Sequence, residues 1–98
     1  MASLFWNSEV RELPESIENV VIWRTVVEGG LRRLGFANVR RSNLDVAGGK
    51  GGCWVSVAHF HIAGRRFWEV VMCGGDAADA TKNTVAEVVD MIRRSHTL

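Results

Sequence analysis

The sequence predicts an α+β domain of element order α-β-β-β-α, in which a three-stranded antiparallel meander carries two helices on one face. Two observations support this fold class. Apolar residues recur at three- and four-residue steps near both ends of the chain, a spacing typical of amphipathic helices. Between these segments, runs of β-branched and aromatic residues alternate with glycine-rich breaks, which is typical of strands joined by turns.

Length and composition are those of one globular domain spanning residues 1–98. Of the 98 residues, 47% are hydrophobic and 23% are charged, which argues against disordered and collagen-like classes. No apolar run approaches the roughly 18 residues that a membrane span needs, and the N-terminal residues lack the basic start of a secretory signal. Two cysteines are too few for a disulfide scaffold, so we expect a reduced, cytoplasmic setting.

Residues 1–13 are expected to form an N-terminal arm that leads into the first helix. Pro14 and Ser16 predict the helix start, because proline suits the first turn and a serine hydroxyl can accept a hydrogen bond from an unpaired amide. Gly35 suits the left-handed residue that ends a helix. The apolar stripe of this helix comprises Ile17, Val20, Val21, Val27, Leu31 and Leu34.

A strand is the alternative for the middle of this segment. Residues 20–27 are dense in β-branched side chains, and Gly29 and Gly30 would each cost a helix interior about 1 kcal/mol. The helix is preferred because the apolar stripe continues beyond both glycines to Leu31 and Leu34.

Three strands and a second helix follow. Residues 36–43 and 53–62 predict the first two strands, and a turn at Ala63-Gly64 leads to a third strand over residues 66–73. Asp76 or Asp79 can then cap the last helix. The apolar stripe of that helix comprises Ala78, Thr81, Val85, Val88, Val89 and Ile92.

The glycine-rich segment Ala47–Gly52 is expected to be a loop between the first two strands. A phosphate-binding loop would need a lysine followed by serine or threonine and then a helix. Here Lys50 is followed by Gly51, and the next element is a predicted strand. The segment therefore indicates a connection and not a nucleotide site.

Arginine is concentrated in adjacent pairs. Ten of the twelve basic residues are arginine, and eight of those occur in pairs, although the net charge is only +1. In the predicted order of elements, three pairs meet at one end of the domain and form a candidate site for an anionic partner: Arg32, Arg33, Arg65, Arg66, Arg93 and Arg94. Favourable interaction with the helix dipoles explains two of these pairs equally well, so nucleic acid or another polyanion is an alternative partner and not the preferred one.

Candidates for metal binding and catalysis are few. His59 and His61 lie two residues apart on a strand and so point to one face, but no ligand spacing typical of zinc accompanies them. Cys73 is the one candidate nucleophile, and a thiol enzyme that pairs it with a histidine is a further alternative. We expect no metal, no cofactor and no catalytic residue.

The predicted sheet carries apolar residues on both faces, whereas two helices can cover only one. An arm bearing Leu4, Phe5 and Trp6 could cover the second face, but a second copy of the chain is preferred, because flat aromatic faces suit homodimers. The predicted self-association face comprises Val55, Val57, His59, Phe67 and Val71. The sequence thus favours a small, non-enzymatic interaction domain that forms a homodimer through its sheet.

Overall fold

The structure is a computed structural model that describes residues 5–13, 20–74 and 82–95. Along these residues it has five strands and two helices. The elements are β1 (Phe5–Glu12), α1 (Val20–Arg33), β2 (Ala37–Arg41), β3 (Asp45–Lys50), β4 (Cys53–Ile62), β5 (Arg65–Gly74) and α2 (Lys82–Ser95).

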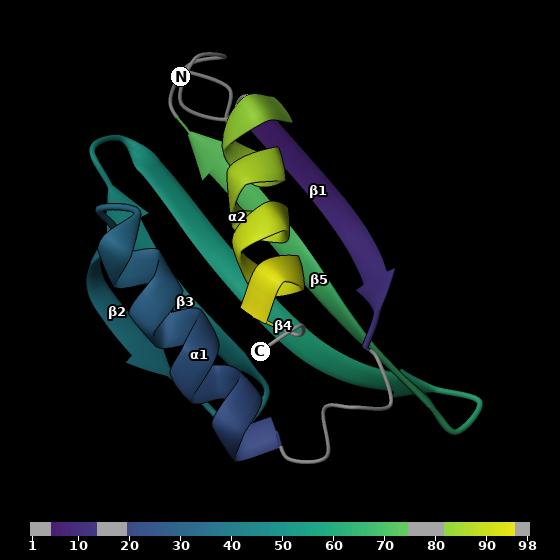
Figure 1. The fold of residues 1–98 in the computed structure, drawn as a ribbon. Helices are drawn as coiled ribbons and strands as arrows, with labels where there is room; N and C mark the ends of the chain where they lie inside the picture. The colour runs from purple at the N-terminus through teal and green to yellow at the C-terminus, as the bar shows by residue number, and fades with distance from the viewer. Residues whose placement is uncertain (1–4, 14–19, 75–81, 96–98) are drawn as a thin grey trace.

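The strands form one antiparallel sheet of order β1-β5-β4-β3-β2. Strands β2 to β5 are consecutive neighbours, whereas β1 pairs with β5 and so becomes the far edge (Figure 1). Both helices lie on the same face: α1 packs over β2 and β3, and α2 packs over β5 and β1. We call the helix-covered face the inner face and the opposite one the outer face.

The core lies between the inner face and the helices. From Cys53 to Phe60 the residues of β4 alternate in burial, because successive side chains of a strand point to opposite faces. In α2, Val85, Val88, Val89 and Ile92 are buried, which confirms the apolar stripe predicted for this helix over its described part. The largest fully buried side chains are Trp23, Trp68, Leu31, Met72 and Ile92.

The α+β class is confirmed, but the three-stranded meander is wrong because the sheet has five strands. Residues 5–12, which were expected in an arm, form the edge strand β1. The predicted first strand over residues 36–43 corresponds to β2, which ends at Arg41 and is the first strand of the β2–β3 hairpin. The predicted glycine loop is mostly strand β3, which pairs with β4 from Asp45 to Lys50.

Close packing explains why glycines occupy β3. A Cβ atom on Gly48 would lie 3.0 Å from Cγ2 of Val39, and one on Gly49 would lie 3.0 Å from the indole of Trp54. These distances are shorter than ordinary van der Waals contact, so neighbouring side chains occupy the space that a larger residue would need. The glycines that suggested flexibility therefore mark close approach within a sheet.

Helix α1 spans residues 20–33, which confirms the helix and excludes the alternative strand. Gly35 has a φ of +94°, and the amide of Phe36 donates to the carbonyl of Leu31 at 3.0 Å. This is the glycine-terminated helix end that the sequence predicts. The expected helix starts, at Pro14 and Ser16 and at Asp76 or Asp79, lie outside the described residues.

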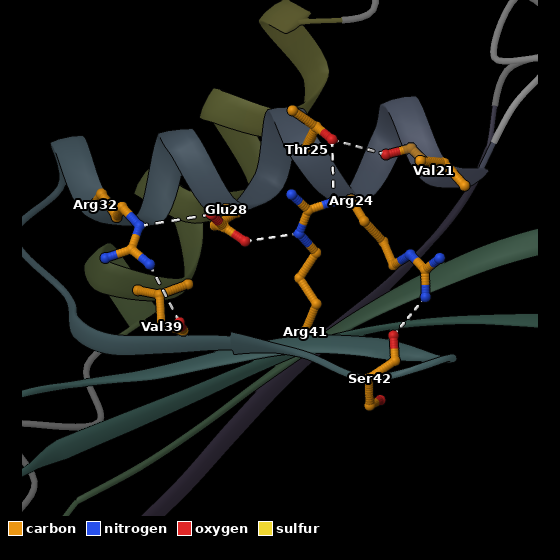
Figure 2. A network of polar contacts seen from close by, with 8 residues as sticks. All are labelled: Val21, Arg24, Thr25, Glu28, Arg32, Val39, Arg41 and Ser42. Carbon is orange, nitrogen blue, oxygen red and sulfur yellow. Dashed lines mark hydrogen bonds and ion pairs between the residues drawn. The ribbon is translucent and has the colours of Figure 1, made fainter.

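A polar network joins α1 to the edge strand β2 (Figure 2). Nε of Arg41 donates to Oε1 of Glu28 at 2.7 Å, and Nε of Arg32 lies 3.7 Å from the other carboxylate oxygen. The hydrogen bond from Arg41 is the main reason why the pKa of Glu28 is lowered. Arg32 also donates to the carbonyl of Val39, and Arg24 donates to that of Ser42. These arginines therefore hold β2 under the helix.

Candidate functional site

The most prominent surface feature is a row of side chains on the outer face. Trp6 of β1 and Trp54 of β4 both lie directly opposite Cys73 of β5. The tryptophans are 66% and 45% exposed, respectively. No described helix or strand lies over this row, because both helices occupy the other face of the sheet.

Further apolar side chains extend this row along the outer face. The rings of Phe60 and Phe67, which are opposite each other on β4 and β5, stack with centroids 5.7 Å apart and an interplanar angle of 19°. Together these residues make the outer face of three strands largely apolar, although Glu69, Ser8 and Ser56 share that face with them. We define the outer patch as Trp6, Val10, Trp54, Phe60, Ile62, Phe67 and Val71.

Charges of both signs surround the outer patch. The guanidinium of Arg65 donates two hydrogen bonds to the carboxylate of Glu12, at 2.6 and 2.5 Å, and its Cζ lies 5.8 Å from the centroid of Phe67. These hydrogen bonds lower the pKa of Glu12. Asp45 accepts hydrogen bonds from the hydroxyl groups of Ser42 and Ser56. The rim therefore offers no excess of positive charge to a polyanion.

The predicted self-association residues do not share a face. Val55, Val57 and His59 are buried beneath the helices, whereas Phe67 and Val71 belong to the outer face. Strand pairing explains the error: His59 lies opposite Trp68, so the inner face of β5 carries residues of even number. The sequence pattern separates the two faces of each strand, but without the register it cannot say which faces belong together.

This reasoning missed five of the seven residues of the outer patch: Trp6, Val10, Trp54, Phe60 and Ile62. Alternation along residues 53–62 already groups Trp54 with Phe60 and Ile62, so the pattern contained three of the seven residues of the outer patch. Trp6 could not be found in this way, because residues 5–12 were not recognised as a strand.

The six predicted anion-binding arginines do not meet at one end. Arg33 precedes β2, whose first pair, Ala37 with Gly49, lies beside the β3–β4 turn. Arg65 and Arg66 follow the β4–β5 turn at the other end of strands ten residues long, roughly 30 Å away. The additional hairpin β2–β3 reverses the chain once more than expected, and this separates the arginine pairs.

Two of these arginines do line a common groove. Arg33 of α1 and Arg94 of α2 border an open groove of about 710 Å³ between the helices, with Ile22, Val26 and Met91 on its walls. Arg93 instead lines a depression of about 500 Å³ between α2 and β1. Arg32 and Arg65 are engaged with Glu28 and Glu12, respectively.

The cysteine and histidine candidates are also separated. Cys73 faces outward, whereas His59 lies on the inner face and is only 5% exposed. His59 and His61 do share a side, with ring centroids 4.9 Å apart. Burial is the main cause of the lowered pKa of His59, and the charges of His61, Arg66 and Arg24 lower it further. The described residues contain no group of three or more His, Cys, Asp or Glu that could hold a metal ion.

Comparisons with protein-family models, with curated proteins and with solved structures gave no match. Within the described ranges, neither helix is both long and apolar enough to cross a membrane. Functional inference therefore rests on the surface of the protein itself.

Proposed function

We propose that the protein is a small interaction domain that forms a homodimer through the outer patch. The observation that carries this proposal is the Trp6–Cys73–Trp54 row, which lies uncovered by any described element on the open face of the sheet. Aromatic residues on a flat surface are enriched at interfaces between identical chains.

A second copy is the partner that this surface favours. Removing a large apolar side chain from water contributes on the order of 1–2 kcal/mol, and a pair of identical faces gains this contribution on both sides. The mixed charges at the rim do not require a strongly charged partner. A two-fold interface also brings the same patch of each copy together, so complementarity needs no second surface.

The experiment is a measurement of solution mass by sedimentation or light scattering over a range of concentrations. We expect Trp54→Glu to weaken association at least tenfold, because it places a charge in the Trp6–Cys73–Trp54 row. Ile22→Glu is the matched control, since Ile22 is 61% exposed but lies on α1, on the other side of the sheet. A monomeric wild type, or equal effects of both substitutions, would overturn the proposal.

A second candidate function is anion binding in the groove between the helices. Its support is the combination of Arg33 and Arg94 with apolar walls, which suits a ligand that has both an anionic and an apolar part. Binding of a fluorescent single-stranded oligonucleotide tests the polyanion form of this function. Affinity should fall with salt and with the double substitution Arg33→Ala and Arg94→Ala, whereas a flat salt dependence would exclude it.

A further inference from the structure

Strand β1 presents one complete row of backbone groups away from the sheet. The amide of Leu13, just beyond β1, donates to the carbonyl of Arg66 at 2.9 Å, which identifies residues of odd number as those bonded to β5. In an antiparallel pair the alternate residues, here those of even number, point their N–H and C=O groups away from the neighbouring strand. Among the described residues, no strand pairs with that side of Ser8, Val10 and Glu12.

The two edges of the sheet differ in how they are protected. Edge strands commonly avoid pairing with other chains by means of bulges, prolines or repelling charges. β2 has a register shift between Ala37 and Arg40, and Asn38 has a φ of +54°. β1 pairs with β5 over eight consecutive residues without a shift, and it contains neither proline nor glycine. Only β1 therefore offers a regular template for another strand.

The charges on β1 are self-complementary. Glu9 and Arg11 lie two residues apart, both on the inner side of the strand, and their side chains form an ion pair. Like charges at such positions would repel an identical strand. Because these two charges are opposite, an antiparallel copy can place each of them beside its counterion.

We propose that β1 pairs antiparallel with β1 of a second copy around a two-fold axis at Val10, so that the two sheets become continuous. This register sets Val10 opposite Val10 of the second copy and Ser8 opposite Glu12. Both are positions whose backbone groups point outward, so they exchange hydrogen bonds. Glu9 then lies opposite Arg11 in the closer, non-hydrogen-bonded pairs, and symmetry creates this ion pair twice.

Neighbouring registers are less favourable. An axis at Glu9 sets Glu9 opposite Glu9 of the second copy and places like charges in direct contact. An axis at Ser8 keeps the hydrogen bonds, but it pairs Glu9 with Asn7 and forms no cross-strand ion pair. Charge therefore selects the axis at Val10.

The helix beside this edge is compatible with such an approach. Glu87, Asp90 and Arg93 of α2 line the depression next to Glu9 and Arg11. This wall carries two acidic side chains and one basic side chain, so Arg93 of each copy offers a counterion to the carboxylates that face it across the axis. The outer patches of both copies stay on the same side of the continuous sheet, and this inference is therefore independent of the proposed function.

Exchange of charges tests the register. Each of the single variants, Glu9→Arg and Arg11→Glu, places like charges opposite one another in a homodimer. The association constant of each homodimer should therefore be at least tenfold lower than that of wild type. Mixed together, the two variants restore both opposite-charge pairs, and a heterodimer should form. A mixture that stays monomeric, although circular dichroism shows both variants folded, would overturn the proposal.

A second measurement keeps the test decisive if a single variant fails to fold. The double variant Glu9→Arg with Arg11→Glu preserves the ion pair within the strand and should form its own homodimer. When the double variant is mixed with tagged wild type, it should form at least tenfold less mixed dimer than untagged wild type does. The reason is that a dimer of the double variant with wild type places like charges opposite one another. Free exchange between the two would contradict the register. Trp54→Glu, which tests the outer patch, should leave this charge dependence intact, so the two interfaces can fail separately.

Discussion

Gly30 of α1 and Met91 of α2 lie in direct contact where the two helices meet. A Cβ atom on Gly30 would lie 2.6 Å from Cε of Met91 and 2.9 Å from its Cγ. Gly30→Ala should therefore lower the free energy of unfolding by about 1–3 kcal/mol, since overpacking exceeds the gain in helix propensity. Urea denaturation followed by circular dichroism measures this change.

Gly29 provides the matched control one residue away. Its Cβ would meet only the guanidinium of Arg33, at 3.4 Å. Gly29→Ala should be neutral or should stabilise the protein by up to about 1 kcal/mol, because alanine is the better helix former. Equal destabilisation by both substitutions would show that helix contact is not what selects Gly30.

His59 should make the protein sensitive to mild acid. Because burial lowers its pKa in the folded state, only the unfolded chain takes up the proton as the pH falls below the ordinary histidine value of about 6.5. Stability should therefore be unaffected by His59 above that pH and should decrease below it. Each unit by which the folded pKa lies below the unfolded one corresponds to about 1.4 kcal/mol.

Comparison of urea unfolding at pH 7.5 and pH 5 isolates this contribution. His59→Leu should lose less stability on acidification than wild type, whereas His61→Gln should reduce the loss only in part, because burial remains the main cause of the lowered pKa of His59 when the His61 charge is removed. If all three proteins lose stability equally, another group is responsible for the acid sensitivity.

A residue better suited to the β4–β5 turn should raise the free energy of unfolding. Ala63 and Gly64 have φ values of +52° and +76°, the combination of a type I′ turn. Asparagine tolerates this region better than alanine, so Ala63→Asn should raise the free energy of unfolding by about 0.5–1 kcal/mol. Ala63→Val should lower it, and thermal melting of both variants provides the comparison.

Cys73 should report on occupation of the outer face. It lies between Trp6 and Trp54 and is partly exposed, whereas Cys53 is buried. In a Cys53→Ala background, alkylation of Cys73 by a maleimide should slow as the protein concentration rises if the outer patch is an interface. A rate independent of concentration, measured where the protein is known to self-associate, would place the interface elsewhere.

Local patterns predicted much of this fold. The stripe from Val27 to Leu31 identified α1 despite its glycines, and the alternation of β4 and the Ala63-Gly64 turn were apparent in the sequence. Gly30 shows the limit of such reasoning. Its helix-breaking tendency is a local property, whereas its contact with Met91 depends on a helix more than fifty residues away.

Register and long-range pairing were beyond the sequence pattern. The partner of β1 is β5, and no local feature of residues 5–12 indicates that pairing. The face of β5 that joins the inner face of β4 depends on which residues oppose one another. The predicted self-association surface failed for this reason, although the individual strands were mostly correct.

The order of strands has a consequence for synthesis. Of the five described strands, β3, β4 and β5 can pair as they emerge, because each lies beside the strand before it, but β1 is made before the other four and pairs with the last of them. Pairing across so long a stretch of chain closes slowly. β1 must therefore leave the ribosome and remain unpaired until β5 has been translated, so the earliest of the five described strands is the last to join the sheet.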